Sequence, residues 1–116
     1  MRHRKKKRRM SRPADQRKAA LRALTTNLLR EKQISTTLAN ARAAAPEIEK
    51  IISLAKKGDL HARRQAASFI YDKEVVQDLF DAVVDRYKDQ NSGFTRIIKN
   101  GMRRGDNAQL AILQLV

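Results

Sequence analysis

Residues 109–116 read Gln-Leu-Ala-Ile-Leu-Gln-Leu-Val, and this stretch decides the fold of the 116-residue chain. Apolar side chains occupy both parities of the segment, with Leu110 and Ile112 on the even positions and Leu113 and Leu115 on the odd ones. Successive side chains of a strand point to opposite faces of a sheet, so apolar residues on both parities are typical of a buried strand. We therefore expect a central or well-covered strand here.

A partner for this strand is predicted immediately upstream. Residues 94–99 are rich in β-branched and aliphatic side chains, and residues 100–107 contain two glycines and an Asp-Asn pair that are typical of turns. The two β-like segments are expected to form a hairpin with an enlarged basic loop. Residues 33–36, Gln-Ile-Ser-Thr, contain β-forming residues and predict a third, single short strand.

The first helix is predicted over residues 13–32, with Ser11 as its cap. Its apolar stripe is formed by Leu21, Leu24 and Leu28. Three cations fall on the opposite side, namely Lys18, Arg22 and Arg30. A solvated face is the simplest interpretation of these three. Because Lys18 and Arg22 continue from a basic start of the chain, we favour phosphate contacts for these two, whereas the two interpretations are balanced for Arg30.

Two further helices follow, each with a recognisable start signal. Thr37 is the expected cap of the second helix, which ends before Gly58. Pro46 lies inside this segment and predicts a bend, because proline removes a helical hydrogen bond. Asp59 then caps a short third helix over residues 60–69.

The fourth helix is predicted over residues 73–89 and has the clearest amphipathic pattern. Its apolar stripe consists of Val75, Val76, Leu79, Phe80, Val83, Val84 and Tyr87. Opposite this stripe lie five carboxylates, which we call the acidic ridge: Glu74, Asp78, Asp81, Asp85 and Asp89. Phosphates would repel this surface, so we expect it to face solvent or a basic partner rather than nucleic acid.

The positive charge of the chain is concentrated at its two ends. The formal charge is +14, and residues 1–36 account for a net +11, residues 37–90 for zero and residues 91–116 for +3. Residues 1–12 hold eight Arg or Lys and no carboxylate. Such a segment cannot bury enough apolar surface to order itself, so we expect a disordered basic arm that binds a polyanion. A single domain is expected over residues 13–116.

Other classes of function find little support in the sequence. There is no cysteine, no cluster of metal ligands, no catalytic constellation and no phosphate-binding glycine loop, so neither an enzyme nor a cofactor is expected. No apolar run approaches the length of a membrane span. A nucleoid-type DNA-binding protein is one rival, but the sequence offers no sign of a dimer. A membrane-surface protein is another, but no apolar residue interrupts residues 2–9.

The distribution of aromatic residues narrows the mode of nucleic-acid binding. All five fall in core-like patterns outside the basic segments: Phe69, Tyr71, Phe80, Tyr87 and Phe94. Base stacking needs exposed aromatic rings, so the pattern favours phosphate contacts, which position a protein without reading sequence. A large, already folded RNA suits this chemistry.

Several motifs along the whole chain are similar to those of a known family. They are Met1-Arg2-His3-Arg4, Pro13-Ala14-Asp15-Gln16-Arg17-Lys18, Arg22-Ala23-Leu24-Thr25-Thr26, Thr36-Thr37-Leu38, Gly58-Asp59-Leu60-His61-Ala62-Arg63-Arg64, Gly93-Phe94-Thr95-Arg96-Ile97 and Arg104-Gly105-Asp106-Asn107-Ala108. In this order they resemble the L-seventeen family of bacterial-type large-subunit ribosomal proteins. The sequence of residues 13–18 is most similar to that of cyanobacterial or plastid members.

This resemblance implies an α/β (α+β) fold, in which a helix layer packs on a small mixed three-stranded sheet. It also implies a structural role in the large ribosomal subunit, with binding to large-subunit ribosomal RNA near the rim of the peptide exit tunnel. Neighbouring ribosomal proteins are the other implied partners, with no membrane and no homo-oligomer. The implied location is the ribosome, in the cytoplasm or, for a chloroplast source, in the plastid stroma.

Contact residues follow from both lines of reasoning. The resemblance implies RNA-facing roles at Arg2, His3, Arg4, Arg17, Lys18, Arg22, Arg63, Arg64 and Arg96. The charge pattern adds Lys5, Lys6, Lys7, Arg8, Arg9, Arg12, Lys99, Arg103 and Arg104. From the residues alone, Arg63 and Arg64 are equally consistent with an exposed helix face, whereas Arg103 and Arg104 favour contact because a loop can enter an RNA groove.

Overall fold

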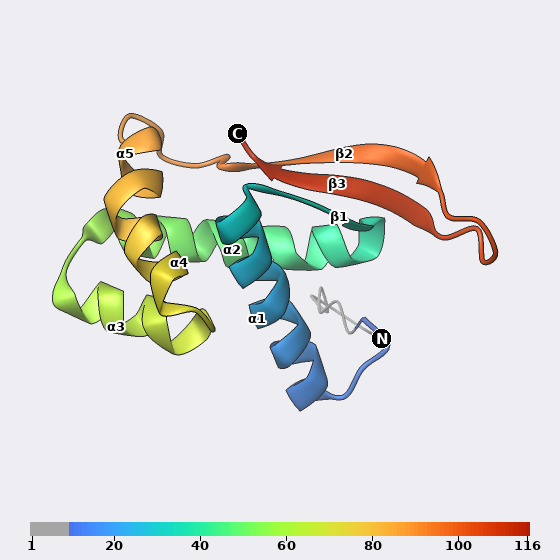
Figure 1. The fold of residues 1–116 in the computed structure, drawn as a ribbon, viewed down its shortest axis with the longest axis horizontal. Helices are drawn as coiled ribbons and strands as arrows, with labels where there is room; N and C mark the ends of the chain where they lie inside the picture. Colours follow the sequence, from blue (N-terminus) through green and yellow to red (C-terminus); the bar gives the residue numbers. More distant parts are fainter. Residues whose placement is uncertain (1–9) are drawn as a thin grey trace, which may run out of the picture.

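A computed structural model describes residues 10–116 of the chain. Its elements follow one another as α1 (Ala14–Glu31), β1 (Gln33–Thr37), α2 (Leu38–Lys57), α3 (Leu60–Phe69), α4 (Lys73–Asp78), the π-helical turn η1 (Leu79–Val83), α5 (Val84–Arg86), β2 (Thr95–Met102) and β3 (Gln109–Leu115). The predicted α+β class is confirmed. The helices lie on one side of a three-stranded sheet, with α2 running beneath the strands (Figure 1).

Strand β3, formed by the apolar C-terminal segment, is the central strand, as predicted. The strand order is β1-β3-β2, and Leu113 of β3 lies opposite both Ile34 of β1 and Ile97 of β2. The expectation of a mixed sheet is wrong, because both neighbours pair with β3 in antiparallel fashion. The outer strands run in the same direction as each other, but β3 separates them, so no parallel pairing arises.

Only one face of β3 is covered by helices. Ala111, Leu113 and Leu115 are buried and belong to the core, whereas Leu110 and Ile112 on the other face are half-buried. The apolar residues at the odd and at the even positions are therefore explained by different contacts. The odd positions pack against the helix layer, and the even positions are shielded mainly by their neighbours within the sheet.

The β2–β3 hairpin is longer than predicted and projects past the helix layer (Figure 1). Strand β2 continues through Gly101 to Met102, with a register shift between Lys99 and Met102, so the loop comprises residues 103–108 rather than 100–107. Gly101 has φ +79°, which glycine adopts without strain, and this lets the irregular strand continue. Residues 98–107 are all exposed, so the end of the hairpin is free to meet a partner.

Helix α1 begins differently from the prediction. The cap position is Pro13, whose carbonyl accepts a hydrogen bond from the Arg17 N–H at 2.8 Å. Ser11 is not the cap, because it lies two residues earlier with φ +54° and outside the helical geometry. The helix ends at Lys32, whose N–H donates to the Leu28 carbonyl at 2.7 Å.

Helices α2 and α3 begin and end as predicted. The Thr37 side chain accepts from the Asn40 N–H, Gly58 ends α2 in the left-handed region with φ +69°, and Asp59 accepts from the Ala62 N–H at 2.7 Å. Helix α2 continues as a single helix through Pro46, and the bend predicted there stays a prediction. Its Ile48 and Ile52 are fully buried beneath the sheet.

Replacing Asp59 by alanine is expected to lower the free energy of unfolding by about 1 kcal/mol, the usual effect of losing a side-chain cap. Asp59→Asn retains an acceptor for the Ala62 N–H and serves as the control. Urea unfolding followed by circular dichroism measures both variants. Equal stability of the alanine variant and the unsubstituted chain would show that the cap does not contribute.

The predicted fourth helix is interrupted by the π-helical turn and ends at Arg86 rather than Asp89. Val75 and Val76 are both buried, and from Val75 onward the buried positions recur every fourth residue, at Leu79, Val83 and Tyr87. In an ideal α-helix a spacing of four drifts by about 40° per step, so a long stripe leaves the core. The wider π turn at residues 79–83 offsets this drift. It keeps the last two of these side chains on the buried face.

The C-terminal end of this helical segment is tied to the sheet. The rings of Tyr87 and Phe94 pack with centroids 5.1 Å apart, and both side chains are almost fully buried. The Tyr87 hydroxyl donates to the carbonyl of Val116 at 2.9 Å. Burial raises the pKa of Tyr87, consistent with a phenol that stays protonated as a donor.

Candidate nucleic-acid interface

The predicted contact residues fall on several separate elements. Residues 2–9 of the arm lie outside the described residues. The others come from the segment before α1 (Arg12), from α1 (Arg17, Lys18, Arg22), from α3 (Arg63, Arg64), from β2 (Arg96, Lys99) and from the hairpin loop (Arg103, Arg104). All of these are exposed except Arg17 and Arg22, which are half-buried. The fold thus presents cations along α1, on α3 and along the projecting hairpin.

Arg22 is already engaged within the fold. Its Nε donates to the carbonyl of Phe69 at 2.7 Å, and its Cζ lies 4.2 Å from the centre of the Tyr71 ring. The side chain therefore links α1 to the connection between α3 and α4. Any phosphate contact by Arg22 must use the guanidinium in this fixed orientation.

Arg30, for which sequence reasoning was balanced, forms an ion pair with Asp72 at 2.8 Å. The neighbouring Lys32 pairs with Asp78 at 2.6 Å. The pKa of Asp72 is lowered by the hydrogen bond from the Glu74 N–H and by the Arg30 side chain. These contacts join the end of α1 to α4. Asp78, one of the five carboxylates of the acidic ridge, is therefore paired with Lys32 and is not simply solvated.

The hairpin loop is organised around one carboxylate. Asp106 accepts two hydrogen bonds from Arg103, from Nε at 3.1 Å and from Nη2 at 2.6 Å, and a third from the Ala108 N–H at 3.2 Å. The Arg103 N–H donates to the Ala108 carbonyl at 2.7 Å. Within the described part of the chain, Arg104 forms no ion pair, so it is the uncompensated cation of the loop.

Lowering the pH is expected to leave the loop intact until the pH falls well below 4. The Arg103 guanidinium and the Ala108 N–H lower the pKa of Asp106 from 3.8 to about 2. A carboxylate with a lowered pKa stabilises the folded loop above its ordinary pKa and loses this contribution as pH falls through the lowered value. NMR titration of the Asp106 carboxyl carbon measures the midpoint. A midpoint at the ordinary value of 3.8 would show that the Arg103 pairing does not persist in solution.

Most of the acidic ridge lies far from the hairpin tip. Glu74, Asp81, Asp85 and Asp89 are exposed along α4, η1, α5 and the turn after it. This helical segment is at one end of the molecule and the hairpin loop at the other (Figure 1). Within residues 10–116, the exposed carboxylates and the projecting basic hairpin thus lie at opposite ends of the long axis of the molecule.

Sequence reasoning misplaced Tyr71 in the core. The side chain is 55% exposed, because residues 70–72 connect α3 to α4 and do not continue either helix. The next residue, Asp72, caps α4 by accepting a hydrogen bond from the Glu74 N–H at 3.0 Å, and an Asp just before a helical pattern was a signal that Tyr71 lies in a connection. The other four aromatic side chains are buried or half-buried.

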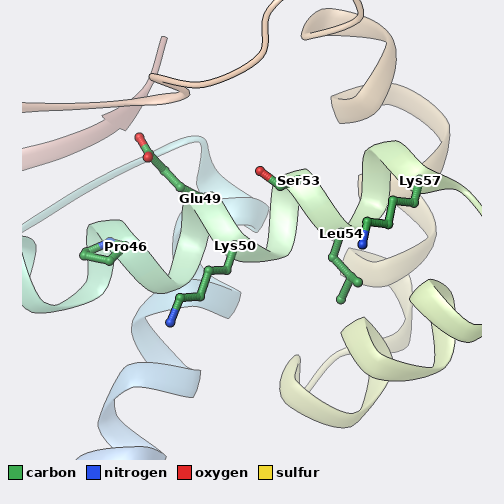
Figure 2. Close-up of a pocket in the computed structure, with 6 residues that line it drawn as sticks. All are labelled: Pro46, Glu49, Lys50, Ser53, Leu54 and Lys57. Carbon is green, nitrogen blue, oxygen red and sulfur yellow. The ribbon is translucent and has the colours of Figure 1, made fainter.

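A shallow groove of about 400 Å³ runs along α2 (Figure 2). Glu49 projects towards the strands, where it accepts a hydrogen bond from the Thr95 hydroxyl at 3.1 Å. Lys50 on the other side lies 3.6 Å from Glu47. These charged groups serve contacts within the fold, and the groove presents no convergent set of groups for chemistry.

Neither a metal centre nor a membrane span is found in residues 10–116. No group of three or more His, Cys, Asp or Glu side chains is placed there to hold a metal ion. No helix among these residues is long and apolar enough to cross a bilayer.

The fold and its surface define a class: a small α+β protein with many separate exposed cations on its surface. The sequence model described as Ribosomal protein L17 matches residues 20–116, and the chain belongs to this family. The resemblance to this family is thereby confirmed. Membership makes the chain a structural, rRNA-binding constituent of the large ribosomal subunit that acts in translation.

Proposed function

We propose that this protein holds folded large-subunit rRNA near the rim of the peptide exit tunnel, through phosphate contacts made by its separated basic elements. The proposed contacts are the eighteen basic positions named from the sequence, from Arg2 in the arm to Arg104 in the hairpin loop. Family membership supports the rRNA as the ligand. The exit-tunnel location rests on the resemblance of the motifs.

The observation that carries the proposal is the projecting hairpin. Arg96, Lys99 and Arg104 are exposed on an element that extends past the helix layer, and no core requires this extension (Figure 1). Phosphate contacts from such an element fix the position and orientation of a protein on RNA. Cations on α1 and α3 then supply further attachment points, so separate RNA segments are held by one rigid body.

Directed hydroxyl-radical probing tests this orientation, because the chain has no native cysteine to interfere. An iron chelate is attached to a single cysteine, introduced by Asn100→Cys in the hairpin or by Asp85→Cys in the acidic ridge. Both positions are exposed, and neither is a proposed contact. After assembly into large subunits, the hairpin position is expected to cleave rRNA strongly at the rim of the exit tunnel, and the ridge position weakly.

Two results would overturn the proposal. Stronger cleavage from the ridge than from the hairpin would show that the protein faces the RNA with the opposite surface. Strong cleavage from the hairpin at rRNA segments remote from the tunnel rim would contradict the location and leave the orientation intact.

A further inference from the structure

A groove of about 480 Å³ lies where α3 meets α4, which we call the Tyr71 groove. Its lining includes Arg63, Ile70, Tyr71, Lys73, Val76 and Gln77. Ile70 and Val76 are buried and form an apolar floor, whereas the other four side chains are exposed. This volume is within the range of sites that hold small ligands, and the combination of apolar floor and polar rim is typical of them.

The tyrosine ring is held in place and yet open to solvent. The Tyr71 N–H donates to the Thr26 hydroxyl at 3.2 Å, and the Arg22 guanidinium lies over the ring at 4.2 Å. The side chain is nevertheless 55% exposed. The hydrogen bond restrains the Tyr71 backbone, and the ring, packed against the Arg22 guanidinium, has already lost part of its freedom before any ligand binds, which lowers the entropic cost of stacking.

The charges around the groove select an anionic ligand. Arg63 and Lys73 line it, no carboxylate does, and neither cation forms an ion pair within residues 10–116. The Arg63 guanidinium lies 5.2 Å from the Phe80 ring, which supports its side chain. The carboxylates of Asp72, Glu74 and Asp78 line a different groove, together with Arg30 and Lys32.

We propose that the Tyr71 groove binds one unpaired RNA nucleotide, whose base stacks on Tyr71 and whose phosphate contacts Arg63 and Lys73. The Gln77 amide, with its donor and acceptor, lies within the same lining to meet the edge of the base. An unpaired base offers a π face to an aromatic ring, whatever its identity. This site rests on the proposed RNA-binding function and adds base stacking to an interface otherwise made of phosphate contacts.

Tyrosine fluorescence gives a direct readout of stacking. The chain has two tyrosines and no tryptophan, and Tyr87 is only 1% exposed. Titration of the full-length protein with an eight-nucleotide adenylate RNA is therefore expected to quench the emission of Tyr71. Binding of the same labelled RNA is measured by anisotropy at several salt concentrations.

Three variants separate stacking from charge. Tyr71→Leu removes the ring and is expected to weaken binding about tenfold, with an unchanged salt slope. Tyr71→Phe keeps the ring and is expected to bind like the unsubstituted protein. Lys73→Gln removes a phosphate contact and is expected to reduce the salt slope by about one. Leu60→Ala, at a side chain that is 63% exposed on α3, is the control for truncation of an exposed apolar residue.

The outcomes distinguish this site from the wider proposal. Stacking would be overturned if the unsubstituted protein showed no quenching and the Tyr71→Leu variant bound the RNA with the same affinity. Salt-dependent binding retained in both proteins would leave the phosphate interface standing. Weakening by Tyr71→Phe as large as that by Tyr71→Leu would also overturn stacking. If the unsubstituted protein bound neither this RNA nor large-subunit rRNA, the proposed function itself would be overturned.

Discussion

Deletion of residues 2–9 is expected to flatten the salt dependence of rRNA binding more than any other change to the chain. The segment carries seven Arg or Lys residues. Each phosphate neutralised contributes about 0.7 to 0.9 to the slope of log affinity against log salt, so the slope falls by about five to six. Between 50 and 200 mM salt the intact protein then loses about 10³-fold more affinity than the deletion variant.

A variant with the seven cations replaced by glutamine keeps the length of the arm and is the matched control. Both variants are expected to show the same slope, with the helix content of the folded body unchanged by circular dichroism. Filter binding to large-subunit rRNA at four salt concentrations measures the slopes. An unchanged slope after deletion would mean that the arm is not a ligand of the phosphates.

Replacement of Leu113 by alanine is expected to give the largest loss of stability, about 2–5 kcal/mol in the free energy of unfolding. Leu113 is fully buried at the centre of the middle strand, opposite Ile34 and Ile97. It faces the helix layer, so its truncation opens a cavity between the two layers. Denaturant unfolding followed by circular dichroism measures the change.

The same truncation on the open face is the control. Ile98 lies on β2 and is 42% exposed, so Ile98→Ala is expected to lower stability by about 1 kcal/mol or less. Similar losses for the two variants would contradict a core on only one side of the sheet. A small loss for Leu113→Ala alone would contradict its central position.

Local signals in the sequence predicted much of the fold. The apolar residues of 109–116 predicted the central strand, and single polar residues predicted the starts of α2 and α3. These features depend on short-range chemistry: alternation within a strand, and a side-chain oxygen that accepts a backbone N–H a few residues later. Both signals are complete within ten residues, which is why they survive without knowledge of the tertiary structure.

The errors arose where distant segments decide the outcome. The direction of β1 relative to β3 depends on pairing between Gln33 and Gln114, far apart in the chain. The π turn in residues 79–83 follows from the need to keep two apolar side chains on the core, which overrides the regular helical period.

The candidate site was predicted less completely than the fold. Charge along the chain identified cations, but it did not show which of them are engaged inside the fold. Arg30 pairs with a carboxylate 42 residues away, and Arg22 stacks on Tyr71 from another element. Tyr71 itself was assigned to the core because it falls in a core-like pattern outside the basic segments. Its exposure depends on how α3 and α4 are connected.

As an integral large-subunit component held by its contacts with folded rRNA, this chain is expected to stay with the subunit when the salt concentration is raised. Sedimentation of a native lysate through sucrose at moderate and then high salt tests it most directly, with the protein followed by immunoblot. We expect the protein to sediment with the large subunit under both conditions, because many separate phosphate contacts must be broken together. Sedimentation as free protein or with chromosomal DNA would contradict this expectation.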